Sequence, residues 1–183
     1  MRNIKSSRQR GWAMLETTIA FVIIAIVVGS IYVMFENSKR KADVDSNVEA
    51  ITQISSEVQA KYGRLNRYAA VTTAVLVADE TIPKQLRDGA GTTASNIYGG
   101  SISAAPATLT TANDAVALTW PNAPKGHCVD TVTRVAGVAR RIAVDGTVVK
   151  PLDGELDLAA LSTQCDGATA PVTYVFDIGR NAS

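Results

Sequence analysis

Very few residues of this 183-residue chain have the types and spacing that catalysis or metal binding requires. The only histidine, His127, adjoins Cys128, and no further ligands follow at metal-binding spacing, so we expect no metal site and no cofactor. Asp153, Glu155 and Asp157 alternate without the flanking pattern of a Ca²⁺ loop, which predicts a solvated acidic loop. No Ser/His/Asp arrangement can be proposed around that histidine, so the sequence offers no catalytic triad.

The residue whose position requires an explanation is Glu16. It lies near the start of an apolar run, and the residues that follow it, 17–35, carry no formal charge. As a helix, residues 12–35 would be about 36 Å long, which suffices to cross a bilayer core of about 30 Å. Ionisable groups inside membrane segments are costly and by default functional. Glu16 is therefore the first candidate functional residue.

Residues 1–11 carry four basic side chains and no acidic one. Because Lys and Arg favour the cytoplasmic side of a membrane, this basic leader places the C-terminal part of the chain outside the cytoplasm. In a translocated domain the even pair Cys128 and Cys165 predicts a disulfide, with two unrelated buried thiols as the alternative. No basic patch with interleaved aromatic residues is present, which argues against nucleic-acid binding.

Three explanations compete for the apolar run. A secretory signal peptide would be shorter and would end in small residues in an A-x-A pattern, which the run does not meet before the charged residues 36–41. A plain membrane anchor explains the length and the flanking charges but gives Glu16 no purpose. The third explanation is a helix that stays in the membrane only until it packs against copies of itself.

The helix is predicted to continue past the apolar run. Apolar residues recur three or four positions apart, on one face of a helix, at Val44, Val48, Ile51, Ile54, Val58 and Tyr62. No proline interrupts residues 12–62, and Gly63 is typical of a helix C-terminus. Because this stripe is short for a coiled coil, docking against the chain's own globular part is favoured.

Residues 64–183 are predicted to form a globular α+β head with an antiparallel sheet. Thr72 and Thr73 can cap a short helix at 74–78, and residues 129–139 have the spacing of a second helix beside Cys128. Strand signals occupy residues 97–98 with 101–103, 115–120 up to Pro121, 142–144, 147–149 and 172–178. Residues 151–168, which include Cys165, are predicted to be rich in loops.

Gly11, Trp12 and Glu16, between a basic leader and a long apolar helix, resemble the processing site of type IV prepilins. The resemblance implies a lollipop fold, in which a long N-terminal helix packs its C-terminal half on an antiparallel sheet. It implies that a prepilin peptidase cuts between Gly11 and Trp12 and that Trp12 is a candidate for N-methylation. In the filament, Glu16 would accept the positive amine of a neighbouring Trp12, because opposite charges attract far more strongly in an apolar core than in water.

The long leader, Trp12 as first mature residue and the mature length resemble the type IVb subclass, which includes enteric adherence pili and conjugative thin pili. The implied partners are identical subunits, the prepilin peptidase, an assembly ATPase with its membrane platform, and an outer-membrane secretin. The precursor is expected in the inner membrane with its head in the periplasm, and the assembled pilus outside the cell. Many family members have a helix-loosening proline about twenty residues into the mature helix. In this chain the candidate weak point is Gly29 and Ser30, so we expect any local loosening in the filament there.

We therefore expect three parts: a removable leader at residues 1–11, a helix at 12–63, and the head at 64–183 with its C-terminal disulfide region. Within the helix, residues 12–35 would serve membrane insertion and polymerisation, and residues 36–63 would be amphipathic. The expected function is that of a major pilus subunit for adhesion, aggregation or conjugative contact. A minor pilin or a secretion-system pseudopilin would share this N-terminus, and a membrane-anchored periplasmic binding domain is a third alternative.

Overall fold

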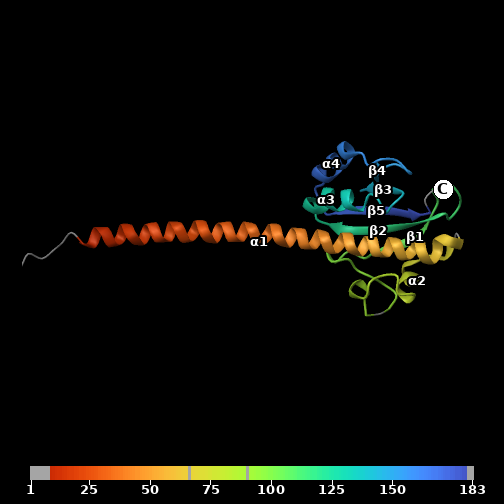
Figure 1. Ribbon diagram of the computed structural model, residues 1–183, viewed down its shortest axis with the longest axis horizontal. Helices are drawn as coiled ribbons and strands as arrows, with labels where there is room; N and C mark the ends of the chain where they lie inside the picture. Colours follow the sequence, from red (N-terminus) through yellow and green to blue (C-terminus); the bar gives the residue numbers. More distant parts are fainter. Residues whose placement is uncertain (1–8, 66, 90, 181–183) are drawn as a thin grey trace, which may run out of the picture. The chain divides into compact units, whose positions relative to one another are not determined.

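The computed structural model describes residues 9–65, 67–89 and 91–180, without the side chains of residues 9–15 and 65 (Figure 1). The chain consists of an N-terminal unit, Met1–Ala42, and a C-terminal unit, Asp43–Ser183. The helix α1, Gln9–Tyr62, contributes residues to both units. It begins three residues before the predicted start and ends beside Gly63 as predicted, while most of the predicted leader lies outside the described residues.

The C-terminal unit contains a five-stranded sheet in the order β1-β2-β5-β3-β4, and every neighbouring pair of strands is antiparallel. Its strands are β1 (Ser103–Ala107), β2 (Ala115–Ala123), β3 (Arg141–Val144), β4 (Thr147–Lys150) and β5 (Val172–Gly179). The last strand in the sequence, β5, is central, so both of its edges are hydrogen-bonded. The predicted α+β class with an antiparallel sheet is confirmed.

One face of α1 within the C-terminal unit packs against this sheet. Ile51, Ile54 and Val58 are fully buried and belong to the same hydrophobic core as Trp120 of β2 and Phe176 of β5. In Figure 1 this part of α1 runs alongside β2. The apolar stripe was therefore predicted correctly, and its partner is the chain's own sheet rather than a coiled coil.

The remaining helices are α2 (Thr73–Ala78), α3 (Lys125–Val135) and α4 (Leu158–Gly167), with short 3₁₀ helices at Gly63–Leu65, Tyr68–Ala70 and Lys84–Leu86. The side chain of Thr72 caps α2 by accepting a hydrogen bond from the N–H of Val75, as predicted from the threonine pair. α3 ends at Val135, four residues before the predicted end, because the chain turns at residues 136–138.

The predicted strand at residues 97–98 is wrong, because this segment is a turn organised by Asn96. The Oδ1 atom of Asn96 accepts hydrogen bonds of 2.9 Å from the N–H groups of Tyr98 and Gly100. Gly99 adopts a φ of +75°, which few other residues tolerate. The strand of this region begins at Ser103 instead and includes Pro106, which is compatible with β1 because β1 is an edge strand.

Two further boundaries differ from prediction. Pro121 does not close its strand, since β2 continues to Ala123 after a shift of register against β5, and such an irregularity accommodates a proline. Residues 158–167 form α4 rather than loop. The helix is started by Asp157, whose carboxylate accepts hydrogen bonds of 3.0 and 2.9 Å from the N–H groups of Ala159 and Ala160.

Candidate functional site

The apolar segment, residues 17–35, is exposed throughout in the single chain. Its large apolar side chains have exposed fractions between 49% (Val27) and 71% (Phe21 and Met34). α1 is long and apolar enough to cross a membrane, with a mean hydropathy of 2.6 in its most apolar window. A continuous apolar surface of this kind marks contact with a membrane or with other protein chains.

Glu16 immediately precedes the apolar segment, and its side chain is exposed. Gly11 and Trp12 lie in the helical backbone of α1, while their side chains are outside the described residues. The structure thus places the three predicted processing and assembly residues on one continuous helix. Their roles in cleavage and in pairing between subunits stay predictions.

The predicted weak point, Gly29 and Ser30, lies inside unbroken helix in this single chain. The hydroxyl of Ser30 donates a hydrogen bond of 2.8 Å to the carbonyl of Val27, which competes with backbone hydrogen bonding in a helix. A Cβ atom at Gly29 would meet no other atom within 4 Å, so space does not require a glycine there. The prediction of loosening concerns the filament and is untested.

The buried face of α1 includes polar residues that the stripe prediction missed. Asn47 and Ser55 are each 1% exposed and lie at helical spacing from Val44 and Ile51. The indole N–H of Trp120 donates a hydrogen bond of 3.2 Å to Oδ1 of Asn47. Their positions on the apolar face were the available signal, since a polar residue there is buried whatever its type.

A polar cluster joins the end of α1 to the segment after α2. Tyr62 donates a hydrogen bond to the carboxylate of Asp79, and burial together with this bond raises the pKa of Tyr62 to about 12. The ammonium of Lys61 donates to the carbonyl of Asp79 at 2.7 Å and to the hydroxyl of Thr81 at 3.1 Å. These contacts fix the C-terminal turn of α1 against the segment that follows α2.

Cys128 of α3 and Cys165 of α4 form the predicted disulfide, with Cα atoms 5.7 Å apart. Both residues are buried in the hydrophobic core. The bond closes a loop with a sequence separation of 37 residues, which corresponds to about 4 kcal/mol of stabilisation on the chain-entropy account. It therefore ties the two helices that flank β3 and β4 in the sequence.

The other chemistry-bearing residues have structural roles. His127 lies with Nδ1 2.7 Å from the hydroxyl of Tyr98. Asp153 forms an ion pair with the nearly buried Arg140, which holds the pKa of that carboxyl below its usual value. Among the described residues no group of three potential ligands could hold a metal ion. The predicted acidic loop thus includes an ion-pair partner at Asp153 and a helix cap at Asp157.

The fold can be compared with known structures. The crystal structure of a type IVb pilin from Salmonella typhi matches with a TM-score of 0.55 and 21% sequence identity, covering 76% of this chain and 99% of that chain. The crystal structure of TcpA, a type IV pilin from Vibrio cholerae El Tor biotype, matches with a TM-score of 0.49 and 18% identity, covering 75% of this chain and 99% of that chain. No curated protein matches the chain significantly. The fold is that of a type IVb pilin.

The sequence identifies the family. The family described as PilS N terminal matches residues 41–177, which is most of the C-terminal unit, and the chain belongs to this family. It is a type IVb-like pilin, a structural rather than an enzymatic protein of a kind that assembles into pilus polymers. The exposed apolar segment fits a membrane-anchored precursor and an extracellular pilus.

Proposed function

We propose that this pilin is the major subunit of a type IVb pilus and that it polymerises through residues 12–35. The observation that carries the proposal is the apolar segment, in which every large apolar side chain is exposed in the single chain. Removing apolar surface from water is worth about 25 cal/mol per Å², so this surface requires lipid or other helices. The inner membrane would cover it in the precursor, and identical subunits would cover it in a filament that serves adhesion, aggregation or conjugative contact.

Glu16 would set the register between neighbouring subunits. It is the carboxylate that adjoins the N-terminal end of the apolar segment, whereas Glu36 adjoins the C-terminal end. A carboxylate and an amine within an apolar filament core attract one another strongly, whereas either charge alone would be desolvated without compensation. The amine of a neighbour's Trp12, released by cleavage, would therefore favour one axial arrangement of the subunits over the others.

Cleavage between Gly11 and Trp12 would create that amine. The bond lies within α1, so we expect the backbone to leave the helix when the prepilin peptidase binds. Glycine has the greatest backbone freedom, which suits a bond that must change conformation. The remaining partners in this proposal are the assembly ATPase with its membrane platform and an outer-membrane secretin.

Mass spectrometry of the mature chain tests the processing step, with Trp12 expected as the first residue and N-methylation visible as an added mass. Gly11→Val should leave the leader attached. Gly29→Ala is the matched control, because its Cβ atom meets no neighbour within 4 Å, and this variant should be processed normally. A wild-type chain that retains its leader in assembled filaments would contradict the proposal.

The amount of this chain in filaments sheared from the cell surface distinguishes a major subunit from a minor pilin or pseudopilin. A major subunit should account for most of the protein mass of the sheared fraction. A trace amount in filaments built mainly from another pilin would assign the chain a capping or priming role.

A further inference from the structure

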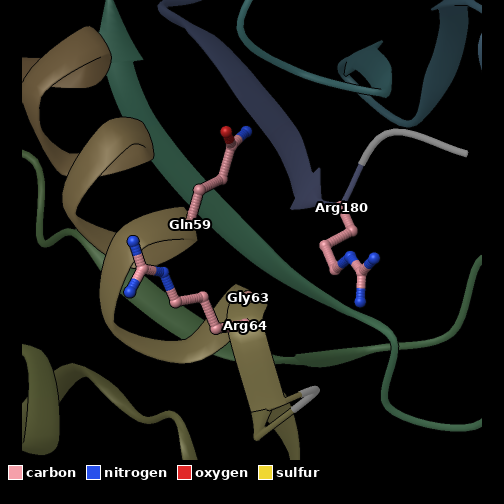
Figure 2. A pocket seen from close by; sticks show the side chains of 4 residues that line it. All are labelled: Gln59, Gly63, Arg64 and Arg180. Carbon is pink, nitrogen blue, oxygen red and sulfur yellow. The ribbon is translucent and has the colours of Figure 1, made fainter. Parts of the chain in front are cut away.

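A hollow of about 400 Å³ lies between the end of α1 and the end of β5 (Figure 2). It is lined by Gln59, Gly63, Arg64 and Arg180. The first three residues come from the end of α1 and the 3₁₀ helix that follows it, whereas Arg180 follows β5 directly. Segments far apart in the sequence therefore combine to build one site inside the C-terminal unit.

The lining of this hollow is cationic. Arg64 and Arg180 are both exposed, and an arginine side chain stays protonated in proteins. No acidic residue lines the hollow, and in the described part of the chain neither guanidinium forms an ion pair. Figure 2 shows the two guanidinium groups directed away from each other, as expected of two like charges with no anion between them.

Gly63 keeps the floor of the hollow open. A Cβ atom at this position would lie 2.9 Å from the hydroxyl of Tyr68, which is fully buried, and 3.6 Å from Cγ of Arg180. The absence of a side chain lets the aliphatic stem of Arg180 approach the end of α1. A larger residue at position 63 would therefore displace either the buried tyrosine or the arginine.

Helix stability explains only part of this arrangement. A cation just after the last turn of α1 interacts favourably with the negative end of the helix dipole, which is a sufficient structural reason for Arg64. The dipole does not explain Arg180, which follows β5 and faces the hollow from the other side. Two arginines from distant segments thus line one hollow that has no acidic residue in its lining, and an anion shared by both accounts for this arrangement.

We propose that Arg64 and Arg180 form a binding site for a phosphate-bearing ligand, with Gln59 supplying an additional polar contact. Guanidinium groups match phosphate oxygens in geometry. A phosphate monoester carries a charge of about −1.5 to −2 at pH 7, so a single group balances both arginines, whereas a single carboxylate leaves one uncompensated. The hollow is larger than one phosphate group, so it has room for a ligand that bears the phosphate on a larger body.

The site is tested on the full-length chain in non-ionic detergent by titration calorimetry and by the NMR signals of the arginine Nε–H groups. Glucose 6-phosphate represents a soluble phosphate monoester, dihexanoyl phosphatidic acid represents a lipid headgroup, and glucose is the neutral control. We expect saturable binding of at least one phosphate probe, with shifts at Arg64 and Arg180. Tighter binding of the sugar phosphate would indicate a soluble ligand, and tighter binding of the lipid would indicate a headgroup.

Arg64→Gln and Arg180→Gln should each weaken binding by about tenfold, since each removes a charged hydrogen-bond donor. Arg67→Gln removes the same charge from the same segment without touching the lining, and it should leave binding within about twofold of wild type. Equal weakening by Arg67→Gln would show a diffuse positive field rather than a site and would overturn the proposal. Absence of saturable binding by both phosphate probes would overturn it as well. The result does not depend on whether the chain polymerises.

Discussion

The indole N–H of Trp120 donates a hydrogen bond of 3.2 Å to Oδ1 of Asn47, and this bond joins the buried face of α1 to strand β2. Both side chains are almost inaccessible to water, with exposed fractions of 0% for Trp120 and 1% for Asn47. The contact is polar, although the surrounding core is apolar. It therefore specifies which turn of α1 faces β2, because a sliding of the helix would leave two buried polar groups without partners.

Replacing Trp120 with Phe should lower the free energy of unfolding of the C-terminal unit by about 1–3 kcal/mol, because Oδ1 of Asn47 would lose its buried donor. Urea unfolding in detergent, followed by hydrogen exchange of the β2 and β5 amides, measures the loss. Gln53→Ala, at an exposed position of α1, should change the free energy by less than about 0.5 kcal/mol. Equal stability of Trp120→Phe and wild type would show that the bond does not hold α1 in place.

Removing the disulfide with the double substitution Cys128→Ser and Cys165→Ser should cost about 4 kcal/mol, the chain-entropy value for a loop of this length. The same unfolding experiment measures it, in the presence and absence of reductant. Reductant should lower the stability of wild type toward that of the double variant and should leave the variant unchanged. A wild-type free energy of unfolding that is the same with and without strong reductant would contradict the expectation.

The main architecture could be predicted because it rests on patterns that repeat. The stripe from Val44 to Tyr62 identified the buried face of α1, and the strand signals at residues 142–144 and 147–149 identified β3 and β4. The central place of β5 in the sheet could not be predicted, because strands that pair across long connections carry no signal in the local sequence that names their partners. The order of strands in the sheet is thus a property of the tertiary packing.

The errors of prediction have local causes. Asn96 folds residues 97–98 into a turn through its side-chain amide, which overrides the strand preference of an Ile-Tyr pair. Asp157 starts α4 by capping its first N–H groups, and the helix was missed although an Asp before the helix-forming residues 158–161 is a signal for a helix start. One polar side chain decides the backbone conformation in both segments.

Asp114 should make the C-terminal unit sensitive to acid. Burial alone would raise the pKa of this carboxyl, but hydrogen bonds from the Thr110 hydroxyl and from the N–H groups of Leu109, Thr110 and Thr111 lower it well below its usual value. A lowered folded-state pKa stabilises the fold fully above the unfolded pKa of about 3.9, and the stabilisation is lost as the pH falls toward the folded pKa. Stability should therefore decline below about pH 4.

Asp114→Asn tests this source of acid sensitivity. At pH 7 it should cost about 1–3 kcal/mol, because an amide oxygen cannot accept all four hydrogen bonds. Below about pH 4 its stability should vary less with pH than that of wild type, as measured by urea midpoints across a pH series. Glu155→Gln is the control, because it removes an exposed acidic side chain, and it should preserve the dependence of stability on pH that the wild type shows. An identical acid profile for Asp114→Asn and wild type would rule out this carboxyl as the cause.

The helix around Gly29 and Ser30 should be the first part of α1 to loosen in a filament. Glycine is a poor helix former, and the Ser30 hydroxyl already bonds to the carbonyl of Val27. A filament density map should show weakened or lengthened helical hydrogen bonds centred on these residues. Unbroken helical density through residues 25–35 would contradict this prediction.

The candidate site was predictable only in part. The charge pattern of residues 1–35 predicted the apolar segment, which the structure shows as an exposed helix, because a membrane segment excludes charged residues. The leader and the role of Glu16 stay predictions. The hollow lined by Arg64 and Arg180 could not be predicted, since these residues of distant segments line one hollow only when β5 takes its place beside β2. A site built from distant segments can be recognised only once the three-dimensional fold is known.

The most direct test of polymerisation through the apolar segment is the yield of filaments sheared from cells that produce Glu16→Ala. We expect this variant to insert in the membrane at the wild-type level and to yield no filaments, because the neighbour's amine would have no partner in the apolar core. Glu36→Ala removes a carboxylate from the same helix just beyond the apolar segment, and it should assemble normally. Wild-type filament yield from Glu16→Ala would contradict the account.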